Sequence, residues 1–276
     1  MKLLEVSRKL RVNHQSMLIR FFHERLLYRV SFSPYKDKLW LKGGNLLYLL
    51  QGNKARPTVD IDFSGQELSN EIDIIRNIFT EILIKDCKDQ VIFDVENMQL
   101  TPITEHNQYS GIRIKLTAGL SNIREIIQLD IAYGDVVTPA PVSLSYPVIL
   151  DEFNAPVVQA YTIETVIAEK LQAILVLAQL NSRMKDFYDI YTLMNTQTIH
   201  LEVLKEAIIK TFNRRNTPLY FESVVFSEEF YYDNNRNKMW SAYLKKINAE
   251  YISFEVVVKR INQLVKKVFS NKNSLL

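Results

Sequence analysis

The sequence lacks several features that would assign a protein to a common class. Cys87 is its single cysteine, so the chain cannot form an internal disulfide bond or a cysteine-based zinc site, and a reducing cytoplasm is the expected environment. The N-terminus has no signal-peptide core, and no later apolar run is long enough to cross a bilayer. The net charge of +3 is too small to indicate a partner. We therefore expect a cytoplasmic protein that has no membrane partner.

Three common motifs and internal repeats are absent as well. The sequence contains no P-loop, no GxSxG and no GxGxxG motif, so these local signals for nucleotide binding or serine hydrolysis do not apply. The 276 residues, of which 47% are apolar, are nevertheless enough to form one large domain or two modest domains with packed cores.

The most informative stretch, residues 39–64, begins with a glycine pair. Gly43 and Gly44 follow a short apolar run that could form a strand, and residues 45–51 carry leucines at helical spacing. A helix is therefore expected to begin at the glycines. Because the first backbone N–H groups of a helix are unpaired and lie at the positive end of its dipole, this turn could bind an anion such as a phosphate.

Two aspartates follow the expected helix. Residues 59–63 alternate Val, Asp, Ile, Asp and Phe, which in a strand places Asp60 and Asp62 on one face and the apolar side chains on the other. Two neighbouring carboxylates repel each other unless a cation lies between them, and hard oxygen ligands suit Mg²⁺. The alternation therefore indicates a cation site.

A third aspartate, Asp130, lies in the strand-like run at residues 125–133. If this strand lies beside the strand that carries Asp60 and Asp62, three carboxylates surround one site. The alternative is an aspartate on an edge strand near the turn at Gly134. We favour the three-carboxylate site because the apolar neighbours of Asp130 should bury the strand, and an unpaired buried carboxylate is costly.

Hydrophobic periodicity predicts the remaining elements. Apolar residues at helical spacing predict helices at residues 1–29, 67–85, 163–180, 200–212 and 236–269, with a further helix opening near residue 182. Strand-forming residues and turn signals predict strands at residues 90–100, 111–120, 125–133 and 146–150. Together they indicate an α/β (α+β) protein with a mixed sheet of about four or five strands flanked by helices, followed by a helical C-terminal region. We expect domains at residues 1–151 and 152–276.

A second charged cluster lies in the C-terminal half. Lys170 falls within an apolar helix, where snorkelling to solvent is the ordinary explanation. Asp186 and Asp189 would share one face of the next helix, and Arg183 and Lys185 bring positive charge to its start. Capping or a salt bridge would account for Asp186, but not readily for so many mixed charges beside aromatic residues.

The C-terminal segment is basic. Such a segment could bind a polyanion, including RNA, through phosphate contacts, and a solvated helical face is an equally good explanation. Against only Glu250 and Glu255, the segment holds nine basic residues: Arg236, Lys238, Lys245, Lys246, Lys259, Arg260, Lys266, Lys267 and Lys272.

These motifs resemble a known family. The glycine pair and the D-x-D strand resemble the nucleotidyltransferase signature, with the sequence KGGNLLYLLQGNKARPTVDIDFS at residues 42–64. The second cluster resembles the second signature of the AbiEii/AbiGii abortive-infection toxins, with the sequence EKLQAILVLAQLNSRMKDFYDIYTL at residues 169–193. Members of that family are nucleotidyltransferase-like proteins of bacterial toxin–antitoxin systems. The chain departs from many of these relatives at Asn45, where they have a small hydroxyl residue.

The resemblance implies a nucleotidyltransferase fold and a role for each candidate residue. Asp60 and Asp62 would bind Mg²⁺, with two ions expected, and Asp130 would be the third metal-binding carboxylate and help to activate the acceptor hydroxyl. The implied catalytic residues are Asp60, Asp62, Asp130, Lys170 and Asp186. The implied nucleotide-binding residues are Gly43, Gly44, Asn45, Arg56, Lys170, Arg183, Lys185 and Asp189.

The expected function follows from that resemblance. It is a Mg²⁺-dependent nucleotidyltransferase toxin that moves a nucleoside monophosphate from an NTP to a hydroxyl of RNA, with tRNA favoured, or of a protein. A cognate antitoxin is an expected partner, and phage defence an expected context. Two alternatives stay open: a catalytically idle module that binds nucleotide or RNA, and an enzyme that modifies a small molecule.

Overall fold

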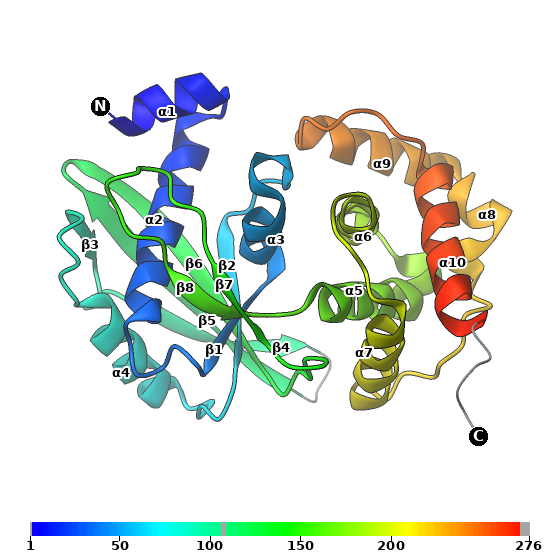
Figure 1. Ribbon diagram of the computed structural model, residues 1–276, viewed down its shortest axis with the longest axis horizontal. Helices are drawn as coiled ribbons and strands as arrows, with labels where there is room; N and C mark the ends of the chain where they lie inside the picture. Colours follow the sequence, from blue (N-terminus) through cyan, green and yellow to red (C-terminus); the bar gives the residue numbers. More distant parts are fainter. Residues whose placement is uncertain (1, 106–108, 271–276) are drawn as a thin grey trace. The chain divides into compact units, whose positions relative to one another are not determined.

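The chain divides into two units, which we describe separately. In the computed structural model, which describes residues 2–105 and 109–270, the first unit comprises Met1–Asp135 and Pro141–Tyr161. The second comprises Val136–Ala140 and Thr162–Leu276. Figure 1 labels the helices and strands of both. The domain boundary expected after residue 151 stays a prediction.

A mixed sheet forms the framework of the first unit. Within the described residues it has eight strands in the order β3-β5-β6-β2-β1-β8-β7, and β4 pairs with β5. Strand β2 runs parallel to β6, β1 runs parallel to β8, and the other neighbours are antiparallel. The strands are β1 (Leu39–Lys42), β2 (Asp60–Gly65), β3 (Val91–Phe93), β4 (Gln99–Glu105), β5 (Tyr109–Leu120), β6 (Ile123–Tyr133), β7 (Val142–Ser145) and β8 (Val157–Ala160).

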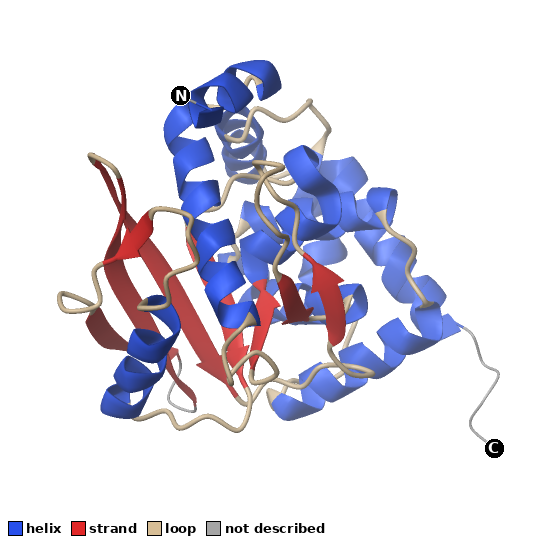
Figure 2. Cartoon of the chain, turned by 60° about the vertical axis from the view of Figure 1, so that its left-hand side comes forward, coloured by secondary structure: helices blue, strands red, loops and turns tan. Residues whose placement is uncertain are grey.

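Helices cover this sheet. They are α1 (Lys2–Leu10), α2 (His14–Ser31), α3 (Gly43–Gln51), the short η1 (Gly52–Lys54) and α4 (Ile72–Leu83). Helix α2 crosses the sheet in contact with β6 and β8, as Figure 2 shows, and it also contacts α4. Helix α3 packs against β1 and β2, so the chain returns to the sheet directly after the glycine pair.

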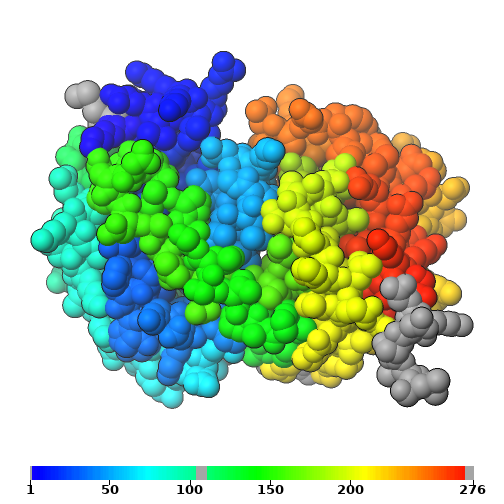
Figure 3. Space-filling view, viewed as in Figure 1, coloured from blue at the N-terminus to red at the C-terminus, as the bar shows by residue number. Residues whose placement is uncertain are grey.

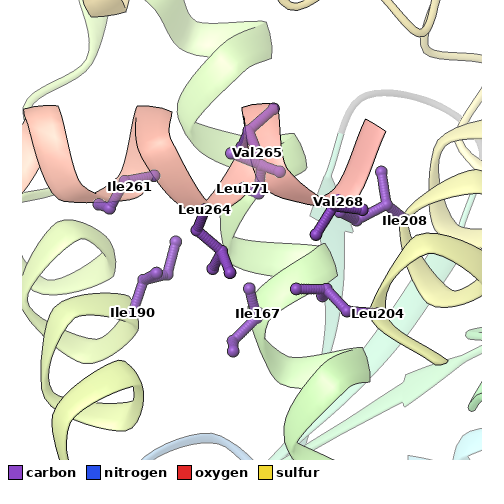
Figure 4. Close-up of a pocket in the computed structure, with 9 residues that line it drawn as sticks. All are labelled: Ile167, Leu171, Ile190, Leu204, Ile208, Ile261, Leu264, Val265 and Val268. Carbon is purple, nitrogen blue, oxygen red and sulfur yellow. The ribbon is translucent and has the colours of Figure 1, made fainter. Parts of the chain in front are cut away.

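The second unit is helical. Its elements are α5 (Ile163–Leu177), η2 (Ala178–Leu180), α6 (Met184–Thr196), α7 (Leu201–Arg214), η3 (Val224–Phe226), α8 (Glu228–Tyr231), α9 (Asn234–Lys246) and α10 (Phe254–Ser270). Leucine, isoleucine and valine side chains from α5, α6, α7 and α10 point toward one another in Figure 4 and form the core. Among the described helices of both units, none combines the length and hydrophobicity needed to cross a bilayer.

The predicted helices were correct in type, but several have different limits. The helix expected at residues 1–29 is two helices, because Arg11 has a positive φ of 53° and Asn13 then caps α2. The helix expected at residues 236–269 is likewise divided, with Asn248 at a φ of 53° between α9 and α10. Helix α4 begins only at Ile72, and α5 ends at Leu177 before the turn of η2.

The predicted strands needed three corrections. Residues 90–100 form parts of β3 and β4, because Asp94 accepts a hydrogen bond from the backbone of Asn97 and closes a turn between them. The strand expected at residues 146–150 is absent from these described residues: the ladder of β7 and β8 ends beside it, and Pro147 has no N–H to extend it. The sheet therefore has more strands than expected: residues 90–100 contribute to two strands, and β7 and β8 form a further part of it.

Candidate metal and nucleotide site

Sheet register brings the three predicted aspartates together. Strands β2 and β6 are adjacent and parallel, with Asp62 opposite Asp130, and Asp60 is two residues earlier on the same face of β2. One carboxylate oxygen from each aspartate lies within 4.8 Å of the others, and all three residues are partly buried. The expectation that Asp130 would lie next to Asp60 and Asp62 is confirmed. Their metal-binding role stays a prediction.

Burial of the opposite strand face fixes this arrangement. Ile61 and Phe63 on β2, together with Leu129 and Ile131 on β6, are all 0% exposed. A slip of one residue in either strand would exchange these apolar side chains with the aspartates, and that exchange would bury the charges. The alternating sequence therefore determines which face carries the carboxylates.

The donor set fits a hard divalent cation. Two oxygens bound to the same Mg²⁺ lie at most about 4.2 Å apart, because each Mg–O distance is about 2.1 Å. The three aspartate oxygens lie within 4.8 Å of one another, so modest side-chain rotation would bring them to a shared cation.

Arg113 is a site residue that the sequence analysis missed. It lies on β5 directly opposite Asp130 on β6. Its Nε and Nη2 atoms donate hydrogen bonds to the two Asp130 carboxylate oxygens at 2.9 and 2.7 Å. The hydrogen bonds to Asp130, followed by the negative charges of Asp130, Asp60 and Asp62, raise the pKa of Arg113. The register of the hairpin between residues 111–120 and 125–133 was the signal that could have revealed it.

The glycine pair is packed tightly against the aspartate strand. Helix α3 begins at Gly43, whose φ is +63°. A Cβ atom added to Gly43 would lie 1.8 Å from Oδ2 of Asp62, and one added to Gly44 would lie 2.4 Å from Oγ1 of Thr58. Thr58 in turn donates a 2.7 Å hydrogen bond to a carboxylate oxygen of Asp60. Glycine is therefore required for the start of α3 to lie against the carboxylates.

Asn45 supports the site from inside the protein. Its side chain is 1% exposed, and its Nδ2 donates to the backbone carbonyl of Asp60 at 2.6 Å and lies 3.2 Å from Nδ1 of His23. The Tyr146 hydroxyl donates to Oδ1 of Asn45 at 2.8 Å. These contacts occupy both the amide nitrogen and the amide oxygen of Asn45. They favour a positioning role over the expected direct contact with a phosphate.

The imidazole of His23 is held neutral in this network. Burial lowers its pKa to about 4, although the hydrogen bond with Asn45 and the charge of Asp60 act in the opposite direction. With Asn45 as donor, Nδ1 of His23 accepts the hydrogen bond and the proton of the neutral ring lies on Nε2. His23 and Tyr146 were not among the predicted residues, because both reach Asn45 from distant parts of the sequence.

The candidate residues of the second unit form an ion-pair network. Lys170 on α5 lies 2.9 Å from a carboxylate oxygen of Asp186 and 2.7 Å from one of Asp189, both on α6. Nε of Arg183 is 2.7 Å from the other oxygen of Asp186. Burial would raise the pKa of Asp186, but Lys170 and Arg183 outweigh it, so the pKa is lowered. The network ties α5 to α6.

Two further candidates lie at the surface of their units. Lys185 is exposed on α6, and Arg56 is half-buried, with a long hydrogen bond of 3.4 Å to the carbonyl of Pro57. The predicted contacts of both residues with a nucleotide stay predictions.

A match to a protein-family model establishes the family of this chain. The model for the nucleotidyl transferase AbiEii toxin of Type IV toxin–antitoxin systems matches residues 25–260, which include every candidate site residue. The chain belongs to the AbiEii family. The resemblance seen in the two motifs is confirmed, and AbiEii membership makes the chain a nucleotidyltransferase of the toxin–antitoxin type.

Solved structures agree on the fold. A candidate nucleotidyltransferase from H. pylori is 16% identical, with 94% of this chain and 96% of that chain covered and a TM-score of 0.51. The JHP933 protein from Helicobacter pylori is 14% identical, with 94% and 97% covered and a TM-score of 0.51. No protein with a curated description matches the chain. The expected nucleotidyltransferase fold, a mixed sheet flanked by helices with a helical C-terminal region, is confirmed.

Proposed function

We propose that this AbiEii chain is a Mg²⁺-dependent toxin that transfers a nucleoside monophosphate from an NTP to an RNA hydroxyl, with tRNA as the favoured acceptor. The observation that carries the proposal is the convergence of Asp60, Asp62 and Asp130 beside the glycine-opened helix α3. The proposal includes a cytoplasmic location and a cognate antitoxin as partner, in keeping with the Type IV family.

The chain's own residues would do three things in this reaction. Asp60, Asp62 and Asp130 would hold the metal ions, and Asp130 would help to take up the proton of the acceptor hydroxyl. The backbone N–H groups of Gly43 and Gly44 would bind phosphate oxygens at the start of α3. Bound Mg²⁺ would neutralise charge on the transferring phosphoryl group and on the leaving pyrophosphate. Such transfer depends mainly on position and charge, so no covalent nucleophile is required.

The second unit offers weaker support for an RNA acceptor. Helices α9 and α10, orange to red in Figure 3, lie at the surface of their unit. Their exposed lysines include Lys238, Lys245, Lys246, Lys266 and Lys267.

Other basic residues of this segment already contact protein groups. Arg236 donates to Gln179, Lys259 pairs with Glu255, and Arg260 donates to Asn195. Lys272 lies outside the described residues. The five lysines named above are therefore the part of the basic segment best suited to phosphate contacts.

Transfer of label from α-³²P NTPs tests the proposal. The protein is incubated with each of the four NTPs, total RNA and Mg²⁺, and the products are separated by size. We expect label on RNA of tRNA size with one or a subset of the nucleotides, and no label when EDTA replaces Mg²⁺. Absence of label on both RNA and protein with all four nucleotides would contradict the proposal.

A catalytically idle binding module is the second candidate. The observation that favours it is the pairing of Asp130 with Arg113, because a carboxylate held by two charge-assisted hydrogen bonds is a poorer metal ligand. The two candidates differ in cells that express the toxin. Toxicity that survives replacement of Asp60 by Asn would support binding without catalysis, and loss of toxicity with intact folding would support the enzyme.

A further inference from the structure

Arg113 and Asp130 form a two-pronged ion pair inside the candidate metal site. The guanidinium lies on β5 and the carboxylate on β6, at paired positions of the antiparallel ladder. Both carboxylate oxygens accept a hydrogen bond from it, at 2.9 and 2.7 Å. The side chain of Arg113 is 38% exposed and that of Asp130 is 18% exposed. The pair is therefore open enough for exchange with a cation from solvent.

The same oxygens are those a metal would need. Asp130 contributes one of the three mutually close carboxylates, together with Asp60 and Asp62. Gln128 already reaches one Asp130 oxygen at 3.4 Å, so the carboxylate is surrounded by donors. Each carboxylate oxygen keeps a second lone pair, but the guanidinium draws on both oxygens and places a positive charge beside any bound cation, so the two compete for the negative charge of Asp130.

We propose that Arg113 is an internal counter-ion that competes with the metal for Asp130. The inference rests on the metal site of the proposed function. Without metal, the guanidinium reduces repulsion among the three carboxylates and keeps the site folded. Its positive charge and its two hydrogen bonds weaken Asp130 as a metal ligand, so metal affinity is lower than three carboxylates alone would give. Arg113 acts through Asp130 and is thus a positioning residue.

Two opposite effects distinguish this competition from a purely structural role. Replacing Arg113 by Gln removes the competing charge, so the metal-free protein should melt at a lower temperature while its metal affinity rises. A purely structural residue would instead lower both the melting temperature and the metal affinity when replaced. The two readouts need no enzymatic activity.

Arg124 provides a matched control. It lies on β6 in the same hairpin and is exposed, and its Nη1 donates to the carbonyls of Ser121 and Ile123 at 2.6 and 2.7 Å. Arg124→Gln changes the net charge by the same amount as Arg113→Gln, without removing a hydrogen bond to an aspartate of the site.

The test is a calorimetric titration of the metal-stripped full-length protein with Mg²⁺ and, separately, Mn²⁺, without nucleotide. We expect Arg113→Gln to bind about tenfold more tightly than the wild type, since the positive charge that opposes the cation is gone. Arg124→Gln should stay within about twofold of the wild type. Arg113→Lys keeps the charge but loses the planar fork, so its affinity should fall between those of Arg113→Gln and the wild type.

Three results would contradict the proposed competition between Arg113 and the metal ion. Equal or weaker binding by Arg113→Gln, with binding still lost in Asp60→Asn, would overturn the competition and leave the metal site in place. No metal binding by the wild type or by Arg113→Gln at metal concentrations on the order of 10 mM would overturn the metal site and the proposed function with it. If Arg113→Gln does not fold, as judged by circular dichroism, Arg113→Lys takes its place, and unchanged affinity in that variant overturns the competition.

Discussion

The two aspartate clusters of this molecule use the same residue types in opposite ways. In the first unit, Asp60, Asp62 and Asp130 face one another on two strands and are partly exposed. In the second unit, Asp186 and Asp189 are each only 1% exposed and hold Lys170 between them. The first cluster gathers negative charge where a cation can enter. The second neutralises its charge within the protein.

The local backbone explains the difference. Side chains two residues apart on a strand point to the same side of the sheet, so Asp60 and Asp62 are held together by β2 and repel each other. Asp186 and Asp189 are three residues apart on a helix, so both can reach a single lysine from the neighbouring helix. The spacing of the aspartates thus separates a cation site from a buried salt bridge.

Removal of Lys170 should produce the largest loss of stability. Lys170→Met leaves two buried carboxylates without this partner, and breaking a buried ion pair costs about 3–5 kcal/mol. We expect the free energy of unfolding in urea at pH 7 to fall by that amount. Lys185→Met, an exposed lysine on α6, is the control and should change it by less than about 0.5 kcal/mol. Equal effects of the two substitutions would contradict the buried network.

Acid should weaken the His23–Asn45 network, which supports the first cluster, before it weakens the second cluster. His23 has a native pKa of about 4 and an unfolded pKa of about 6.5, so the unfolded state binds an additional proton between these values. Stability from the neutral ring is complete above pH 6.5 and is lost as the pH falls towards 4, by about 3 kcal/mol in total. Because the native pKa of Asp186 is lowered, its contribution is lost only at lower pH, as the pH falls through that native pKa.

The comparison of wild type with His23→Asn isolates this effect. Glu24 has a native pKa raised to about 7, mainly by burial, and therefore changes stability in the opposite direction between pH 4.5 and 7. Both proteins retain Glu24, so the difference between their unfolding free energies removes its contribution. That difference should shrink by about 3 kcal/mol from pH 6.5 to pH 4, and a constant difference would show that His23 is protonated in the native state.

A methyl group at Gly43 should disable the first cluster. In Gly43→Ala the added Cβ collides with Asp62, and a displacement of about 1 Å at a reacting site can lower the rate by about 100-fold. Gly52→Ala is the control, because Gly52 also has a positive φ of 60° but no atom within 4 Å of an added Cβ. Both variants should lose about 1–3 kcal/mol from backbone strain. Only Gly43→Ala should lose label transfer, and equal losses would assign the effect to strain.

Replacement of Asn45 should have the smallest effect of the series. Asn45→Ser keeps a polar group, but its shorter side chain cannot reach His23, Tyr146 and the Asp60 carbonyl together. We expect the free energy of unfolding to fall by about 1–2 kcal/mol. Tyr146→Phe removes only one of these hydrogen bonds and should cost less. Unchanged stability in Asn45→Ser would show that the network is dispensable.

Local sequence patterns predicted the part of the site that is local. The strand–glycine–helix–strand segment followed from periodicity, and apolar neighbours marked Asp130 as part of a buried strand. Arg113 depended on hairpin register, and His23 and Tyr146 on contacts across more than twenty residues of sequence. Periodicity does not encode such long-range pairing. The strands β7 and β8 escaped prediction because prolines interrupt the sequence around them.

Label transfer by Asp62→Asn tests the central claim most directly. The variant keeps the size of the side chain but removes one of the three negative charges, and its folding is checked by circular dichroism. At saturating Mg²⁺ and NTP we predict transfer on the order of 1,000-fold slower than in the wild type, because the metal ions would no longer be held in place. Transfer by folded Asp62→Asn within about tenfold of the wild-type rate would contradict a metal-dependent reaction at these carboxylates.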